Sequence, residues 1–524
     1  MIVIQNLTLR PGEPESKLKK LAARELKCSP ADLKSFAITK KSLDARKKSD
    51  IRYVYAVAVT VDGDETEWAK RSGHASVKQP FVYEIPTVHP EKRPVIVGFG
   101  PAGMFAALVL TYAGARPIVL ERGGDVDSRQ KAVDAFRAGG PLDPENNVQF
   151  GEGGAGTFSD GKLNTNTHDP RNRWVLEQFA RHGAQTSILY DAKPHIGTDV
   201  LVHVVRNIRE TVIVGGGEVR FGAKVTGLTT DSGRVTGVIV NGTETIQTDD
   251  VILAIGHSAR DTFPWLRDMG VAMERKPFSM GVRIEHRQAD LDRAQYGRDR
   301  GKDLPPVSYT LSCHLPDGTS AYTFCMCPGG YVFAAASEEG GVCTNGMSYS
   351  GRGGENANAA LLVTLHPEDF PGEDVLGGME WQREIERAAY HYGGDDYRAP
   401  CQLVGDFLAH RPSTGPKSVT PTYAPGVVYG DLRQVLPERI TEVMANALPV
   451  LGKKLPGFDH PDAVMTGPET RSSSPVRIVR GEDLQSGSLR GLYPCGEGAG
   501  YAGGITSAAA DGIRCAEAVL ERYR

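Results

Sequence analysis

The chain has 524 residues, of which 40% are hydrophobic and 24% charged, with 60 Lys and Arg against 64 Asp and Glu. This length exceeds one ordinary domain, so two or three are expected. The near balance of charge, without a basic block, argues against nucleic acid as a partner. Because no apolar run is long enough to span a bilayer and the first ten residues lack signal-peptide features, we expect a cytoplasmic protein.

The eight cysteines do not form a disulfide framework in a chain of this length. The histidines show no HExxH spacing, so we expect no metal site. The closest cysteine pair, Cys325 and Cys327, has C-x-C spacing and two interpretations. It could be a redox pair, but one intervening residue strains a disulfide. We favour the other interpretation, two buried small side chains.

The first segment, residues 1–85, is predicted to be a small separate α+β module. Residues 1–9 and 51–61 have the pattern of strands, and residues 15–28 carry leucines at helical spacing. A stretch with three prolines, residues 85–94, is predicted to be a linker.

The next segment has a glycine-rich turn between a strand and a helix. The apolar run Val95–Val97 leads into Gly98, and a helical pattern follows to Tyr112. In a dinucleotide-binding fold the first glycine allows the tight turn, the second admits the pyrophosphate, and the third lets helix and strand pack closely. The start of the helix offers free N–H groups and the positive end of its dipole. The predicted contacts are Gly98, Gly100, Pro101, Ala102 and Gly103.

A second strand, Ile118–Leu120, ends at Glu121 and Arg122, both predicted to contact the cofactor. A carboxylate at this position can accept hydrogen bonds from both hydroxyls of an adenosine ribose. This suits NAD and FAD alike, so the first motif leaves both open.

A second glycine turn near the C-terminus favours FAD. The stretch CGEGAGYAGGITSAAADG follows a strand and opens a helix, as in flavoproteins whose chain returns beside the flavin. An NAD-only dehydrogenase has no need of this segment, although a plain α/β closing unit is the alternative. The predicted contacts are Gly496, Glu497, Gly503, Gly504 and Ile505.

Two segments between these turns complete the predicted cofactor domain. A strand ending at Gly256 is predicted to return under the dinucleotide, with Val225 in a neighbouring strand. A further glycine-rich stretch, residues 212–225, has Arg220 where a third glycine would be needed, so we predict a helix-to-strand turn. A dedicated NAD(P)H domain is therefore not expected, and NAD(P)H stays open as an external electron donor.

The stretch FGEGGAGTFSDGKLNT, residues 150–165, has few side chains over much of its backbone. Glycine amides can donate to phosphate or to flavin only where no Cβ intervenes. We therefore predict that this loop lies along the pyrophosphate and the isoalloxazine, with cations offsetting phosphate charge. A flexible surface loop is the alternative, although the apolar residues of the stretch argue for burial. The predicted contacts are Arg129, Gly153, Gly154, Thr157, Asp160 and Lys162.

The motifs together resemble those of bacterial FAD-dependent dehydrogenases in the glutathione-reductase-like flavoprotein superfamily. They are GFGPAGMFAAL, FGEGGAGTFSDGKLNT, KPFSMGVRIEH, TNGMSYSGR, TGPETRSSSPVRI and PCGEGAGYAGGITSAAADG. KKSLDARKKSDIRYVY resembles the signature of the family's N-terminal ferredoxin-like module. The resemblance covers nearly the whole chain and implies FAD and an α/β fold, with a Rossmann-like FAD-binding domain and an inserted β-rich substrate domain. It implies little about the substrate. Glu497 stands where Asp is usual, and its longer side chain could shift the contact of this carboxylate from the cofactor to water or to backbone.

These observations give predicted domain boundaries. Residues 1–85 form the N-terminal module, residues 94–275 with 465–524 form a split FAD-binding domain, and residues 276–464 form the substrate domain.

Three side chains are candidate catalytic residues. Arg283 and Glu285 alternate onto one face of a predicted strand, where they could face the flavin or form a surface ion pair. Arg471 could bind a substrate carboxylate bidentately or take part in ordinary loop hydrogen bonds. His257 is either a proton donor or, more commonly at such a position, a turn residue.

The sequence therefore predicts an FAD-dependent oxidoreductase that exchanges hydride or electrons with a small organic substrate. A dehydrogenase or oxidase, a carbon–carbon double-bond reductase and an aromatic-hydroxylase-like monooxygenase all stay open. The alternatives from other classes are a flavin-binding regulator or scaffold and an NAD-binding dehydrogenase without flavin. The substrate, the electron donor, the oligomeric state and the task of the N-terminal module are not specified by the sequence.

Overall fold

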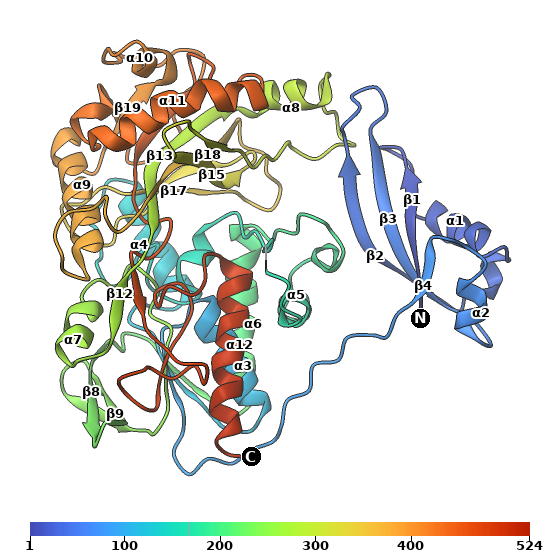
Figure 1. Ribbon diagram of the computed structural model, residues 1–524, viewed down its shortest axis with the longest axis horizontal. Helices are drawn as coiled ribbons and strands as arrows, with labels where there is room; N and C mark the ends of the chain where they lie inside the picture. Colours follow the sequence, from blue (N-terminus) through green and yellow to red (C-terminus); the bar gives the residue numbers. More distant parts are fainter. Residues whose placement is uncertain (166) are drawn as a thin grey trace.

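The computed structural model describes residues 1–165 and 167–524, which form three packed regions (Figure 1). A small module containing the N-terminus stands to one side. A second region is built around a parallel sheet and contains the C-terminus, and a third is built around a large, mainly antiparallel sheet.

The N-terminal module consists of a four-stranded antiparallel sheet and two helices. β1 lies between β3 and β4, and β2 pairs with β3, which gives the order β2-β3-β1-β4. Leu18 and Ala22 of α1 pack against Ile4 and Val57 of the sheet. The elements are β1 (Ile2–Leu9), α1 (Lys17–Glu25), β2 (Ser35–Asp44), β3 (Arg52–Thr60), α2 (Glu65–Ala69) and β4 (Ala75–Val77). The two predicted strands and the predicted helix are confirmed, and the structure adds β2, α2 and β4.

The module contacts the rest of the protein through its β2–β3 hairpin. The backbone of Lys41 in β2 forms hydrogen bonds of 2.7 and 2.8 Å with Tyr190 and Ala192. Ile51 at the start of β3 packs against Tyr296. The linker after β4 crosses to the parallel-sheet region (Figure 1). The module is therefore attached by packing as well as by the linker.

The central sheet of the second region has five parallel strands. In order they are β23 (Leu492–Pro494), β11 (Val251–Leu253), β5 (Val95–Val97), β6 (Ile118–Leu120) and β7 (Glu218–Arg220). Ile96 and Val119 enter the core on one face, whereas Val95 and Val97 enter the core on the other. Burial on both faces explains why these strands are continuous apolar runs and do not alternate.

Helices cover one face of this sheet and a smaller sheet covers the other. The helices are α3 (Pro101–Tyr112), α5 (Arg171–Arg181), α6 (Thr198–Val214) and α12 (Ile505–Glu521). The other face carries β8 (Val225–Asp231), β9 (Arg234–Val240), β10 (Glu244–Gln247) and α7 (Thr262–Asp268). The strand–glycine–helix–strand unit predicted from Val95 to Leu120 is confirmed, as is the helix-to-strand turn between α6 and β7.

The third region contains a seven-stranded sheet. Its order is β14 (Ser312–His314), β15 (Ser320–Cys327), β18 (Asn356–Leu365), β13 (Phe278–Arg287), β21 (Val464–Glu469), β19 (Ala399–Leu403) and β20 (Val427–Tyr429). All neighbours are antiparallel except β19 and β20. Met280, Val282 and Ile284 of β13 enter the core beneath α11 (Glu438–Lys454), so the residues between them face the opposite side.

This region contains more helix than the β-rich domain predicted from the sequence. In addition to α11 it has α8 (Gln288–Tyr296), α9 (Gly377–Gly393) and α10 (Val404–Leu408). The remaining elements are α4 (Val126–Arg137), β12 (Met273–Arg275), β16 (Tyr331–Ala334), β17 (Thr344–Met347), β22 (Val476–Ile478) and 3-10 helices at Pro30–Asp32, Gly154–Phe158, Thr186–Leu189 and Leu432–Gln434. Within the described residues, none of the helices combines the length and apolar character needed to cross a membrane.

α3 and α12 pack closely because glycine stands at their contact. A Cβ added to Gly512 in α12 would lie 2.0 Å from the carbonyl oxygen of Ala102 in α3. In the same way, a Cβ added to Gly103 would lie 2.0 Å from the carbonyl oxygen of Gly98. The packing predicted for Gly103 is therefore confirmed, and these two contacts fix the first turn of α3 against the turn at Gly98 and against the middle of α12.

We expect Gly512→Ala to destabilise the fold by about 1–3 kcal/mol, the usual cost of overpacking an interior. The reason is that backbone of α3 must move to admit the methyl group. Equilibrium unfolding in denaturant measures this change. Gly487→Ala is the control, since its Cβ would meet no described atom within 4 Å. Equal unfolding free energies for the two variants would contradict the close contact.

Candidate functional site

A cavity of about 440 Å³ lies between the carboxyl ends of the parallel strands and the seven-stranded sheet. Ligands of open α/β sheets bind at this end of the strands, and small-ligand sites span about 300–1,000 Å³. The lining residues fall within 97–102, 120–122, 149–164, 223–225, 254–262, 309–326, 469–472 and 495–508, together with Asn345.

The turn between β5 and α3 forms one wall of the cavity. Gly98 has a φ of 97°, and a Cβ there would lie 2.4 Å from the carbonyl oxygen of Ala254. Gly100 is the N-cap of α3, with Pro101 at the first helical position. Both glycines line the cavity, so the N–H groups at the start of α3 point to a space that can hold an anion.

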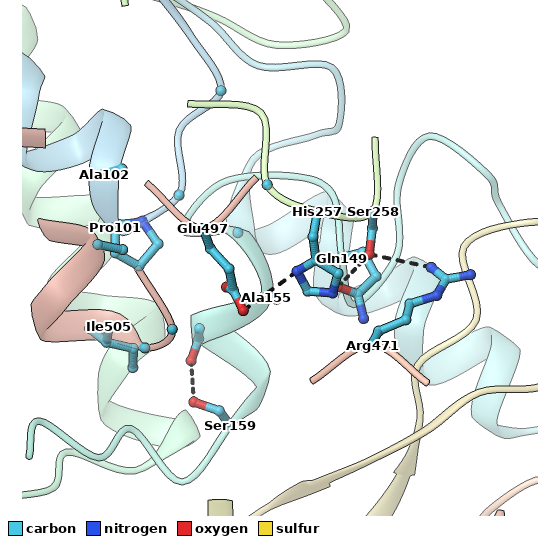
Figure 2. Close-up of a pocket in the computed structure, with 18 of the residues that line it drawn as sticks. Pro101, Ala102, Gln149, Ala155, Ser159, His257, Ser258, Arg471, Glu497 and Ile505 are labelled. Carbon is cyan, nitrogen blue, oxygen red and sulfur yellow. Dashed lines mark hydrogen bonds and ion pairs between the residues drawn. The ribbon is translucent and has the colours of Figure 1, made fainter. Parts of the chain in front are cut away.

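Three glycine segments that are distant in the sequence meet at this wall. A Cβ on Gly154 would lie 2.8 Å from Cα of Gly100, and one on Gly156 would lie 3.3 Å from the side chain of Ile505. Figure 2 shows Pro101, Ala155 and Ile505 at the same end of the cavity. The first turns of α3 and α12 and the 150–165 loop therefore share one cavity.

Glu121 lines the cavity at the end of β6 and also holds the surrounding backbone. Its carboxylate accepts hydrogen bonds from the backbone N–H groups of Phe99, Gly123 and Gly151, at 2.8, 2.9 and 2.9 Å. Each carboxylate oxygen can accept more than one hydrogen bond, so Glu121 can fix the turn and still accept from a ribose.

Arg122 lines the cavity but is committed to ion pairs. It pairs with Glu145 at 2.6 Å and with Asp261 at 2.8 Å. Lys224 pairs with the same two carboxylates. Burial would raise the pKa of Asp261, but Arg122 and Lys224 lower it to about 2. Arg122 is therefore part of a charge-balanced cluster, and its predicted contact with the cofactor has to compete with this cluster.

Four residues that were predicted to contact the cofactor are not among the described residues that line the cavity: Arg129, Gly153, Thr157 and Asp160. The fully buried Arg129 donates to the carbonyl oxygens of Asn147, Val148 and Glu152 at 2.7–2.8 Å. Thr157 donates to Glu152. Contact of these four residues with the cofactor stays a prediction.

Asp160 and Lys162 belong to the same loop, but Asp160 is buried in an ion pair whereas Lys162 lines the cavity. Asp160 is fully buried and pairs through both carboxylate oxygens with Arg352, a partner that the sequence did not suggest. Lys162 lines the cavity and is half-buried, as a cation facing a bound anionic group would be.

The other residues predicted to contact the cofactor also include some that line the cavity and one that lies behind its lining. Those that line the cavity are Ala102, Val225, Gly256, Glu497, Gly503, Gly504 and Ile505. Gly496 lies behind the described lining, where its N–H donates to Asp511 at 2.8 Å.

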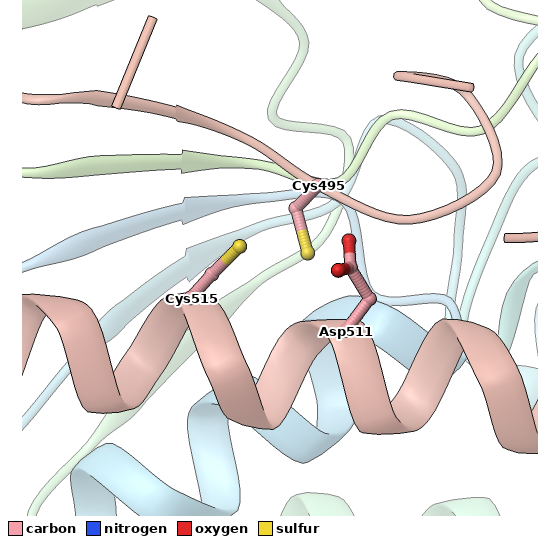
Figure 3. A group of neighbouring side chains, drawn as sticks. All are labelled: Cys495, Asp511 and Cys515. Atoms are coloured by element: carbon pink, nitrogen blue, oxygen red, sulfur yellow. The ribbon is translucent and has the colours of Figure 1, made fainter. Parts of the chain in front are cut away.

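Asp511 belongs to a buried cluster with Cys495 and Cys515, in which the sulfur and carboxylate oxygen atoms lie within 4.8 Å of one another (Figure 3). Arg480 pairs with both carboxylate oxygens of Asp511, at 2.6 and 2.9 Å. Because a guanidinium already balances the carboxylate, the donor set does not favour a metal cation.

His257 provides an unpaired polar atom at the cavity. Its Nδ1 lies 3.6 Å from the carboxylate of Glu497 (Figure 2). Its Nε2 is buried without a hydrogen-bond partner in the described part of the chain. A buried nitrogen without a partner is costly, so a ligand that completes this hydrogen bond fits the cavity.

Arg283 and Glu285 are not among the described residues that line the cavity. Arg283 is fully buried and pairs with both carboxylate oxygens of Glu469, at 2.5 and 2.6 Å. Glu285 is fully buried and accepts from Thr422 at 2.6 Å and from Asn356 at 3.1 Å. Because both side chains are fully buried, they do not form the surface ion pair that was one alternative. A role for them at the flavin stays a prediction.

Arg471 lines the cavity (Figure 2), but its guanidinium is also committed. It donates to Glu386 at 2.7 and 3.0 Å and to Ser258 at 3.3 Å. Arg260 donates to the same carboxylate at 2.8 Å through each of two nitrogens. The bidentate partner of Arg471 in the structure is therefore Glu386 of α9, and its binding of a substrate carboxylate stays a prediction.

The sequence did not reveal the residues that line the cavity on the side of the seven-stranded sheet, in its strands and in the segments next to them. They are Tyr309, Thr310, Thr323, Phe324, Cys325, Met326, Asn345 and Glu469. Of these, the sequence drew attention only to Cys325, for its spacing from Cys327; Cys327 is fully buried, whereas Cys325 is partly buried and lines the cavity.

Comparison with known proteins identifies the family. Residues 277–472 match a family described as "FAD-dependent protein, C-terminal domain-like", and residues 1–60 match a domain of unknown function. An uncharacterized protein of Clostridium beijerinckii is 44% identical over the whole of this chain and 99% of its own length. The chain belongs to this family of FAD-dependent proteins.

Solved structures with similar folds are distant. A flavin-dependent brominase is 14% identical with a TM-score of 0.37, covering 83% of this chain and 79% of its own. Glycine oxidase from Bacillus cereus is 12% identical with a TM-score of 0.32, covering 83% and 96%. Glycerol-3-phosphate dehydrogenase from Bacillus halodurans, complexed with FAD, is 12% identical with a TM-score of 0.35, covering 83% and 64%. With TM-scores this low, none of these likenesses decides the function of this chain.

We expect Glu386→Ala to destabilise the protein by about 3–5 kcal/mol, because it leaves the buried guanidiniums of Arg260 and Arg471 without their carboxylate. Denaturant unfolding measures this loss. Glu384→Ala, at an exposed position of the same helix, is the matched control and should stay near wild type. A small effect of Glu386→Ala would show that the buried cluster contributes little.

The same cluster predicts a pH dependence. Burial alone would raise the pKa of Glu386, but the two arginines hold it far below its ordinary 4.5. A depressed pKa gives stability that is present above 4.5 and is lost as the pH falls below it. Acid should therefore destabilise wild type more steeply than Glu386→Gln, as measured by unfolding at a series of pH values. Parallel pH profiles would contradict this.

Proposed function

We propose that the protein is an FAD-dependent oxidoreductase in which bound flavin exchanges hydride or electrons with a small organic molecule. The observation that carries this proposal is the meeting of three glycine segments on one cavity at the first turns of α3 and α12. Family membership supports the cofactor. Bound flavin would supply the two-electron chemistry, and the chain would supply orientation and charge.

The lining residues suggest how FAD would be held. Gly98 and Gly100, at the start of α3, would bind the pyrophosphate through backbone N–H groups. Glu121 would accept hydrogen bonds from the ribose. Gly154 and Gly156 line the cavity, and their backbone would lie against the flat flavin. Glycine is needed at Gly154 because a Cβ there would lie 2.8 Å from Gly100 on the same wall.

The other regions then have proposed tasks. Residues 94–275 with 465–524 would form the FAD-binding domain, and residues 276–464 the substrate domain, whose sheet closes the cavity opposite α3. The order of strands and helices in residues 1–85 supports a ferredoxin-like module. A substrate would reach the flavin from the side of Thr323 and Asn345.

We expect Gly100→Ala to weaken FAD binding tenfold or more, a free-energy loss of about 1.4 kcal/mol per tenfold, while the fold is kept. The backbone at Gly100 has a φ of −77°, and a Cβ there would be 3.7 Å from its nearest neighbour, so the chain tolerates alanine. A bound pyrophosphate would not tolerate the added methyl group, because it has to approach the backbone at Gly100. Equilibrium dialysis of the apoprotein with FAD measures the affinity, with Gly415→Ala as the control. Equal affinity in both variants would contradict the proposed cradle.

The reaction is tested by anaerobic mixing of the FAD-loaded protein with NADH, NADPH and a panel of metabolites, while the flavin absorbance is recorded. Bleaching by one compound identifies the donor, and the product made from a second compound distinguishes dehydrogenase, double-bond reductase and monooxygenase. Tight FAD without bleaching by any of them would contradict an enzyme and favour a flavin-binding scaffold.

A further inference from the structure

Cys325 and Cys327 meet at the edge of the cavity because β15 is irregular there. The pairing of β15 with β18 shifts between Phe324 and Cys327, and Cys325 has a left-handed backbone with a φ of 49°. A bulge re-aims side chains, and such a conformation costs about 1–3 kcal/mol for a residue with a Cβ. As a result Cys325 lines the cavity, while Cys327 is buried behind it.

Arg283 holds this bulge in place. Its Nη1 donates to the carbonyl oxygen of Cys325 at 2.9 Å, and Glu469 anchors the guanidinium through both carboxylate oxygens. Glu469 of β21 also lines the cavity, and its pKa is raised by burial and by the charge of Cys325. Arg283 is therefore a positioning residue for Cys325.

The bulge also turns Cys327 back toward Cys325: its thiol donates to the backbone carbonyl oxygen of Cys325 at 3.2 Å and is close enough to the Cys325 thiol to lower the pKa of that thiol. In an extended strand, residues i and i+2 are about 6.6 Å apart, near the upper limit of the ~4.4–6.8 Å seen between Cα atoms in disulfides. A left-handed residue at Cys325 shortens this separation. With the bulge, the separation of the two Cα atoms no longer argues strongly against a C-x-C disulfide. Strain in such a disulfide would make its S–S bond easier to reduce.

The surrounding groups make Cys325 the more acidic thiol. The hydrogen bond from Cys327 has the largest effect and lowers its pKa. Burial and Asp160 raise it, whereas Arg283 and Lys162 lower it further, and the pKa of Cys325 falls from 9.0 to about 6. The pKa of Cys327 is raised well above its usual value by that same hydrogen bond and by burial. At neutral pH the pair is therefore one thiolate facing the cavity and one thiol behind it.

We propose that Cys325 and Cys327 are a redox-active dithiol that closes to an intramolecular disulfide by giving two electrons to oxidised flavin. The proposal rests on the FAD function proposed above. In the forward step the S–H bond of Cys327 breaks and the S–S bond forms. The thiolate and the thiol together lose two electrons and one proton, and oxidised flavin takes up both to become the reduced anion. Reduced flavin reopens the disulfide by the reverse transfer.

The first test uses the thiols of the full-length protein and does not require flavin. Alkylation by iodoacetamide, followed by peptide mass spectrometry, should give Cys325 a half-maximal rate near pH 6. In Cys327→Ala that midpoint should move upward, because the hydrogen bond is lost. Cys313, whose pKa is raised by burial, is the internal control and should react only at higher pH. A midpoint for Cys325 at or above that of Cys313 would overturn the proposal.

The second test counts electrons. After mild oxidation with diamide, the peptide that contains both cysteines should be lighter by two hydrogen atoms. Anaerobic titration of the FAD-loaded protein should then consume two equivalents of dithionite per flavin. Cys325→Ser and Cys327→Ser should consume one, and Cys313→Ser should behave as wild type. Wild type that binds FAD but consumes one equivalent would overturn the proposal. Failure to bind FAD would instead contradict the proposed function, while the mass and alkylation results would still decide whether the dithiol exists.

Discussion

The fold of the site depends on the close packing of α3 against α12 and against the turn after β5, which glycine permits at two contacts. Gly103 lets α3 approach the turn at Gly98, and Gly512 lets α12 approach the first turn of α3. Without these contacts the helix N-termini could not border one cavity, since any side chain at either point would separate the elements. A hydrophobic core of sheet and helices then holds the arrangement from both faces of the parallel sheet.

Buried charges hold the seven-stranded sheet against this framework. Arg260 follows β11 of the parallel sheet, Arg471 follows β21, and both bind Glu386 of α9. A buried ion pair is weak evidence for added stability, but it strongly constrains the positions of its partners, because a buried charge left without its partner destabilises the fold. The cluster therefore fixes how the two sheets face each other across the cavity.

The sequence predicted well what local backbone geometry decides. The strand and helix bounds around Gly98 and Gly100, and the glycine turn before Ile505, follow from short-range patterns that need no knowledge of distant contacts. It predicted poorly which charged side chains face the cavity. Asp160 looks like a ligand contact in sequence because its partner Arg352 is distant along the chain. The buried carboxylate partners of Arg283 and Arg471 were missed for the same reason, since an arginine that binds a buried carboxylate cannot be distinguished in the sequence from one that binds a substrate. The reach of Cys325 into the cavity depends on a bulge and a positive φ, which no pattern in β15 signals.

A crystal structure of the protein loaded with FAD tests the central claim most directly. The account predicts one FAD per chain, with its pyrophosphate at Gly98 and Gly100 and its isoalloxazine against the wall that Gly156 and Ile505 form together, within reach of Cys325. FAD bound elsewhere, or density that touches the first glycine turn and not the second, would contradict it.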